Sequence, residues 1–241
     1  MGSLAEEIMK NNNHRYEFSN TSQLDTALVQ AVAGYLQAAI DEEDCASLVV
    51  SGGRTPVAFF QLLSKQLLPW SKVTVTLADE RWVDVDHSDS NEKLVRKNLL
   101  INQASTAKFV SLKNTAESAV AGEATSSDVM NAMGKFTLVI LGMGEDGHTA
   151  SLFPDADVLV QGLDMQLGRA CIAVTPPHAP HPRMSLTLPR LLNTKQLILH
   201  ITGANKIQLI NTALVGDDAL ELPVRAVLHQ QLTPVSIYVA P

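Results

Sequence analysis

The segment Phe136–Leu141 constrains the fold more than any other stretch of the chain. It is an apolar run with β-branched content, and it stops at Gly142. A strand of this kind is typical of a parallel sheet that helices cover on both faces. Three glycines follow within six residues, at positions 142, 144 and 147. Because open α/β sheets bind ligands beyond the carboxyl ends of their strands, we expect the functional site in this glycine turn.

Other segments continue an alternation of strands and helices. Strands are expected at 16–19, 46–50, 72–77, 109–112, 136–141, 171–174, 184–188, 196–201 and 234–240, and helices at 21–40, 56–63, 90–100, 114–133, 189–192 and 206–213. This order predicts an α/β, Rossmann-like fold with a mostly parallel sheet flanked by helices. The 241 residues contain no linker-like stretch, so we expect a single domain over 1–241, with residues 1–15 as a loose N-terminal segment.

Composition excludes several classes of partner. A net charge of −7 with dispersed Lys and Arg, and only 5 % aromatic residues, argues against nucleic-acid binding. The apolar runs are too short for a bilayer, and the N-terminus lacks the apolar core of a signal peptide. Cys45 and Cys171 lie far apart in apolar surroundings, which favours buried free thiols. We therefore expect a cytoplasmic protein without membrane or nucleic-acid partners, and we favour a monomer.

Polar residues follow three of the expected strands. The sequence Ser51-Gly52-Gly53-Arg54-Thr55 leads from a strand into a helix, which suits an anion site or, equally, a plain tight turn. Asp79, Glu80 and Arg81 follow the next strand and are expected to face a cleft, unless they form a surface salt-bridge cluster. Lys206 follows a glycine turn at a helix start, where it either reaches an anion or lies in solvent.

The glycine turn also matches G-x-G-x-x-G, a dinucleotide-binding pattern. We disfavour this interpretation because Glu145 and Asp146 place negative charge beside a would-be pyrophosphate, and Pro154 interrupts the following helix. We also expect no metal at His178 and His181, since the prolines around them exclude a helix and no third ligand is evident.

The segments SGGRTP, ADERWV, LGMGEDGHTASLFP, RMSLTLP and TGANK, in this order, resemble the signatures of the 6-phosphogluconolactonase family, which shares an α/β fold with glucosamine-6-phosphate deaminase. The resemblance implies hydrolysis of 6-phospho-D-glucono-1,5-lactone to 6-phospho-D-gluconate, the second step of the oxidative pentose phosphate pathway, without metal or cofactor. It also implies a sugar-phosphate site. We expect its lining residues to be Ser51, Gly52, Gly53, Thr55, Asp79 and Gly144, and its cations to be Arg81, Arg183 and Lys206.

One departure separates the lactonase pattern from its relative. The deaminase has a Glu in its D-G-H-x-A-F-N-E-P motif where this chain has Phe153, and a phenyl ring cannot move protons. The alternatives of a sugar-phosphate isomerase or deaminase, and of a non-catalytic sugar-phosphate-binding regulator, are therefore disfavoured but stay open.

His148 is the expected general base; the alternative is a structural histidine that bonds its own turn. An imidazole titrates near neutrality, so it can take a proton from the attacking water and return it to the departing ring oxygen. Asp146, two residues earlier, is expected to orient the imidazole or stabilise its charged form. Amides of the turn over residues 142–147 are expected to meet the developing oxyanion.

Overall fold

Strand β6 (Phe136–Leu141) lies in the middle of a seven-stranded parallel sheet. The computed structural model describes residues 13–241, and all six residues of β6 are buried in it. The strand order is β1 (Asn13–Glu17), β10 (Val235–Ala240), β9 (Thr194–Thr202), β6, β2 (Ala46–Val50), β3 (Val73–Leu77) and β5 (Lys108–Phe109), with every neighbouring pair parallel. The expected α/β sheet is thereby confirmed.

The order of the strands creates a switch point beside β6. The chain runs outward from β2 through β3 to β5, and it then returns to place β6 against the other side of β2, with Leu48 paired to Leu138. It continues from β6 to β9 and β10 in the opposite direction. A crevice forms at such a reversal, and ligands of doubly wound sheets bind there.

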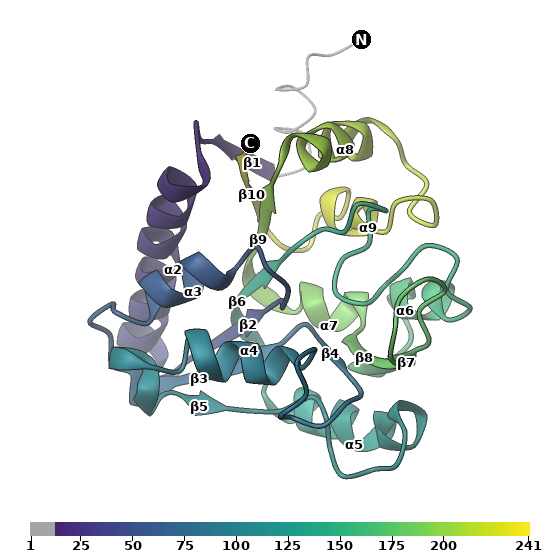
Figure 1. Ribbon diagram of the computed structural model, residues 1–241, viewed down its shortest axis with the longest axis horizontal. Coiled ribbons are helices and arrows are strands. Elements are labelled where there is room, and N and C mark those ends of the chain that lie inside the picture. The colour runs from purple at the N-terminus through teal and green to yellow at the C-terminus, as the bar shows by residue number, and fades with distance from the viewer. Residues whose placement is uncertain (1–12) are drawn as a thin grey trace.

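Helices cover both faces of this sheet (Figure 1). Helices α2 (Thr21–Glu43) and α3 (Val57–Leu63), drawn in purple and blue, lie on one face, and α7 (Leu188–Leu192), α8 (Ala204–Val215) and α9 (Val224–Leu228), in green and yellow, lie on the other. The remaining helices are α4 (Asn91–Asn98), α5 (Ala119–Ala132), α6 (Leu159–Leu163) and two 3₁₀ turns, η1 (Trp70–Lys72) and η2 (Asn102–Thr106). Within residues 13–241, no helix has the length and apolar character needed to cross a membrane.

Helix α2 illustrates how local chemistry sets an element. The side chain of Asn20 accepts a hydrogen bond from the backbone of Gln23 and so caps the first turn. Leu24, Leu28 and Leu36 recur at helical spacing and are fully buried against the sheet. The helix ends at Asp44, which adopts the left-handed conformation with φ of 59°.

A second, antiparallel sheet of three strands was not expected. Its order is β4 (Asp79–Arg81), β8 (Arg183–Leu186) and β7 (Cys171–Val174). Strand β4 follows β3 almost directly, because the backbone of Ala78 bonds both to Val50 in the large sheet and to Leu186 in the small one. We refer to β4, β8 and β7 as the antiparallel ribbon.

Other differences concern the ends of elements. The helix expected over 114–133 begins only at Ala119, because the side chain of Asn114 bonds the backbone of Ala116 in a turn and Ser118 caps the first helical turn. Residues 13–15, expected in a loose segment, instead belong to β1, which pairs with β10. The rest of that segment, 1–12, lies outside the described residues. Helices α6 and α9 had no counterpart in the sequence analysis. Cys171 is buried as expected, but Cys45 is exposed, because it lies in the short connection between α2 and β2.

Candidate active site

The carboxyl ends of β2, β6 and β9 open into a pocket of about 350 Å³. Ten of the eleven site residues proposed from the sequence line this pocket. They are Ser51, Gly52, Gly53, Thr55, Asp79, Arg81, Gly144, His148, Arg183 and Lys206. The eleventh, Asp146, contacts His148. Residues from four separate strand ends therefore converge at the switch point of the sheet.

The turn after β6 holds His148 and Asp146 side by side. The backbone N–H of Gly144 donates to the carbonyl of His148 at 2.9 Å, which closes the turn. Nδ1 of His148 lies 2.5 Å from Oδ1 of Asp146, and the same oxygen accepts the backbone N–H of His148 at 3.2 Å. A Cβ added to Gly144 would lie 2.2 Å from the imidazole, so only glycine leaves room for the ring.

The contact with Asp146 orients the imidazole. Burial acts to raise the pKa of Asp146, but the hydrogen bond and positive charge of His148 outweigh it, and the net pKa is lowered. The carboxylate is therefore ionised near neutral pH and can only accept hydrogen bonds. In the neutral form of the imidazole, Nδ1 of His148 then carries the hydrogen and Nε2 has the free lone pair.

Phe153 packs against this imidazole. The two ring centroids are 4.3 Å apart, and Phe153 also lines the pocket. The position at which the deaminase motif has an acid is thus filled by an apolar ring in contact with His148.

Two arginines face each other across the antiparallel ribbon. Arg81 of β4 and Arg183 of β8 are register partners, and both line the pocket. The Nε atoms of both are buried without a hydrogen-bond partner, and in the described part of the chain neither guanidinium is within salt-bridge distance of a carboxylate. Burial, and next the charge of Arg81, lowers the pKa of Arg183 below its usual value. Two adjacent, incompletely paired guanidinium groups are a strong anion-binding feature.

Glu80, expected to face the cleft, does not. Because side chains alternate along a strand, Asp79 and Arg81 line the pocket while Glu80 points the other way. Its carboxylate accepts the backbone N–H groups of Asn91 and Glu92 at 2.7 Å each, at the start of α4. Burial raises the pKa of Glu80, although these hydrogen bonds oppose the shift. Glu80 is therefore a buried cap of helix α4.

Buried hydrogen bonds fasten the turn after β6 to the ribbon. The hydroxyl of Ser151 donates to Oδ2 of Asp79 at 2.5 Å, and the backbone N–H of Ser151 donates to the hydroxyl of Ser185 at 3.1 Å. Ser151 and Ser185 are fully buried. Asp79 thus lines the pocket and also joins strand β4 to the segment that carries His148.

The loop after β2 closes one wall of the pocket. The hydroxyl of Ser51 donates to the carbonyl of Ile140 at 3.3 Å and links this loop to β6. A Cβ on Gly52 would lie 1.9 Å from the side chain of Asn91, so a glycine is required where the loop meets α4. Thr55 lies beside Thr202 at the end of β9, with 3.5 Å between their hydroxyl oxygens. Lys206 enters the pocket from the first turn of α8.

Three polar lining residues, Arg54, Asn91 and His200, were not proposed as site residues in the sequence analysis. Asn91 was expected only at a helix start, yet it lines the pocket and donates to the carbonyl of Asp79 at 2.9 Å.

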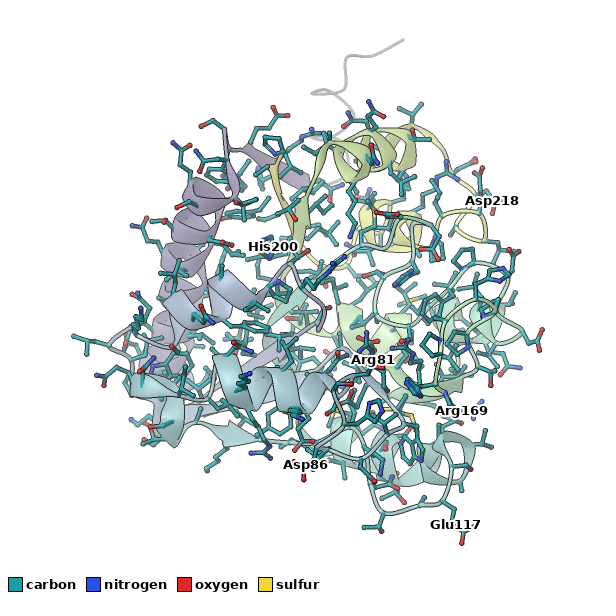
Figure 2. The ribbon with its side chains drawn as sticks, in the orientation of Figure 1. Arg81, Asp86, Glu117, Arg169, His200 and Asp218 are labelled. Atoms are coloured by element: carbon teal, nitrogen blue, oxygen red, sulfur yellow. The ribbon has the colours of Figure 1, made fainter. Side chains whose placement is uncertain are left out.

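His200 lies within β9, and nothing in its sequence context indicated a role. It lines the pocket while its Nε2 faces Oδ1 of Asp25 at 3.6 Å. Burial lowers the pKa of His200 to about 4 and raises that of Asp25 to about 6. Figure 2 shows Arg81 and His200 toward the middle of the molecule, whereas Glu117 and Asp218 lie at its periphery.

The fold and the pocket define an α/β enzyme with a small-molecule site at the switch point of a parallel sheet. The family described as glucosamine-6-phosphate isomerases/6-phosphogluconolactonase matches residues 19–235. The chain belongs to this family, as the motifs indicated.

Individual relatives cover nearly the whole chain. A 6-phosphogluconolactonase of Rhizobium meliloti is 44 % identical over 225 residues, which are 93 % of this chain and 97 % of that protein. One from Pseudomonas putida is 40 % identical over 226 residues, or 94 % and 92 % of the two chains. The crystal structure of a 6-phosphogluconolactonase from Shewanella baltica, 43 % identical, superposes with a TM-score of 0.92 over 95 % of this chain and 98 % of that one. A monomeric glucosamine-6-phosphate deaminase, 16 % identical, shares the fold with a TM-score of 0.79 over 94 % and 97 % of the two chains.

Proposed function

We propose that the protein hydrolyses 6-phospho-D-glucono-1,5-lactone to 6-phospho-D-gluconate, the second step of the oxidative pentose phosphate pathway. The observation that carries the proposal is the composition of one pocket. It holds an imidazole oriented by a carboxylate and, on a separate element, two arginines without carboxylate partners. A phosphorylated cyclic ester needs both features, one for the ester and one for the phosphate. The names of the relatives at 40 % and 44 % identity support the same activity.

The cations would hold the phosphate. Arg81 and Arg183 present planar donors, which match phosphate oxygens, and Lys206 adds a mobile point charge. Ser51, Gly52, Gly53 and Thr55 complete the wall of the sugar-phosphate site. Binding energy from the remote phosphate would then orient the lactone ring for attack.

His148 would act as the general base. Its Nε2 removes a proton from a water molecule as that water attacks the lactone carbonyl carbon, and the imidazolium then protonates the ring oxygen that leaves. Asp146 stabilises the positive charge on the ring during this step. Amides of the turn over residues 142–147 would stabilise the oxyanion. The reaction needs no cofactor in this scheme, because the chain supplies the base, its orienting carboxylate and the cations.

We further propose that the protein acts in the cytoplasm as a monomer on a small-molecule substrate. Two features support this: both cysteines are free thiols, and residues of a single chain supply the base and the cations of the pocket. The acidic net charge of −7 supports the absence of a nucleic-acid partner.

A lactonase assay against the spontaneous hydrolysis rate tests the proposal. We expect rapid turnover of the phosphorylated lactone by the wild type. The His148→Ala variant should lose about 10² to 10⁴-fold in kcat with little change in KM, which is the range for general acid–base catalysis. The control is His14→Ala, an exposed histidine on β1, which should behave as wild type.

The same preparation separates the alternatives. A regulator would bind 6-phosphogluconate without accelerating lactone hydrolysis. A deaminase would release ammonia from glucosamine 6-phosphate, which we do not expect with Phe153 against His148. Either result in place of lactone turnover would refute the proposed function.

A further inference from the structure

His87, Asp89 and His181 form a cluster beside the pocket. Each residue offers one potential metal ligand, a ring nitrogen of each histidine and a carboxylate oxygen of Asp89, and these three atoms all lie within 4.8 Å of one another. His87 and Asp89 belong to the loop between β4 and α4, whereas His181 belongs to the proline-rich loop before β8. The sequence drew attention to His178 beside His181, but the structure brings His181 to a loop 92 residues away.

The three side chains converge with near-ligand spacing. Nε2 of His181 lies 3.0 Å from Oδ2 of Asp89, and Nδ1 of His87 lies 4.0 Å from the same oxygen. The two imidazole rings are 5.2 Å apart and nearly perpendicular, at 77°. Donor atoms bound to one tetrahedral Zn²⁺ at 2.0–2.1 Å are separated by about 3.3 Å. Small side-chain rotations are therefore enough to bring all three atoms to coordination distance.

The backbone presents these side chains in place. His181 adopts a φ of 67°, an uncommon conformation for a residue other than glycine, between Pro180 and Pro182. The carbonyl of Asp89 accepts a hydrogen bond of 2.5 Å from the guanidinium of Arg81. All three side chains are partly exposed, at 42 %, 45 % and 29 % for His87, Asp89 and His181, so an ion and a water can reach them.

We propose that His87, Asp89 and His181 bind one Zn²⁺ ion, with water as the fourth ligand. Two imidazole nitrogens and one carboxylate oxygen are ligands that Zn²⁺ favours. Asp84 and Asp86, on the same loop, are exposed, and Figure 2 shows Asp86 at the periphery of the molecule. Nδ1 of His87 now accepts a hydrogen bond from the backbone N–H of Asp89 at 3.1 Å. When the metal binds, Nδ1 gives up this hydrogen bond and coordinates the ion instead.

The ion would tie two loops at the rim of the pocket. His181 precedes Arg183 by two residues, and Asp89 contacts Arg81 through its carbonyl. A bound ion therefore stiffens the segments from which both arginines enter the pocket. The inference concerns metal binding alone and does not depend on the proposed lactonase activity.

Visible absorption of Co²⁺ bound to the untagged full chain tests the site. We expect one Co²⁺ per chain with the intense bands of tetrahedral coordination, and displacement by Zn²⁺. His87→Ala, Asp89→Asn and His181→Asn should each weaken binding by at least about 10-fold, the lower range for loss of even an outer-shell partner. Asn is chosen at position 181 because it tolerates the left-handed backbone. His178→Ala, exposed on the same loop but outside the cluster, should bind as wild type.

Zn²⁺ should also raise the Tm of the wild type and of His178→Ala, but not of His181→Asn. The proposal is overturned by the absence of tetrahedral Co²⁺ bands in the wild type, or by unchanged affinity in the three cluster variants. Loss of binding in Cys45→Ser would likewise overturn it, because Cys45 is an exposed thiol outside the cluster.

Discussion

Replacing Gly144 with Ala tests whether the position of the imidazole controls the reaction. The new Cβ would lie 2.2 Å from both Cε1 and Nδ1 of His148 and 2.5 Å from Oδ1 of Asp146. Carbon atoms in contact are about 3.5 Å apart, so the ring must move by roughly 1.3 Å. A displacement of about 1 Å in an active site costs on the order of 10²-fold in rate, or about 2.7 kcal/mol of transition-state stabilisation. We therefore expect kcat to fall by about 10²-fold.

Gly34→Ala, in helix α2 and outside the pocket lining, is the control. Gly34 is exposed, and a Cβ there meets no atom within 4 Å, so kcat should stay near the wild-type value. Steady-state lactone hydrolysis measures both variants, and thermal unfolding verifies that each is folded. In a His148→Ala background, Gly144→Ala should cause no further loss, because its effect acts through the ring. A folded Gly144→Ala protein with the kcat of Gly34→Ala would refute the assigned role of His148.

Three further predictions address the base, the anion site and the buried acid. Asp146→Asn should lower kcat by about 10² to 10⁴-fold with little effect on KM, because a neutral amide no longer fixes the tautomer of His148; a wild-type kcat in the lactonase assay would contradict this. Arg183→Ala should raise KM by about 10 to 100-fold through loss of charged hydrogen bonds, and it should weaken inhibition by inorganic phosphate in parallel. The pKa of Asp25 is raised from 3.8 to about 6, so ionisation destabilises the folded state above pH 6 by about 3 kcal/mol at most. Asp25→Asn should therefore increase the free energy of urea unfolding at pH 8, with a gain that shrinks below pH 6 and vanishes near pH 4; an equal gain at all pH values would exclude the linkage.

The large sheet was predictable because a strand that is buried on both faces has a continuous apolar sequence. The sequence of strand β6 is such an apolar run. The alternation of strands and helices along the chain predicted that the sheet is parallel, and the structure confirms it. The ribbon was not predictable in the same way. Strand β4 has three residues, all charged, and its conformation comes from pairing with β8 about one hundred residues later.

The gathering of the proposed site residues followed from one geometric rule. Parallel strands end at the same edge, so the residues after β2, β6 and β9 meet. Asn91 lines the pocket because the start of α4 packs there, and His200 does so from within β9. Neither placement has a signature in the neighbouring sequence. Glu80 was wrongly expected to face the cleft because residues 79–81 were not recognised as a strand. In a strand, side chains alternate between the two faces, so Glu80 points away from the pocket. The roles of His148, Asp146 and the cations stay predictions for the kinetics above.

The hydrogen bonds of Ser151 to Asp79 and Ser185 have a mechanical consequence. They lie in the interior, where water does not compete, and they couple the imidazole-bearing turn to the arginine-bearing ribbon as one rigid unit. The spacing between the imidazole of His148 and the guanidinium groups is therefore fixed before any ligand binds. A ligand of matching length can therefore contact the imidazole and the guanidinium groups at the same time. A shorter or longer ligand can contact only one of them.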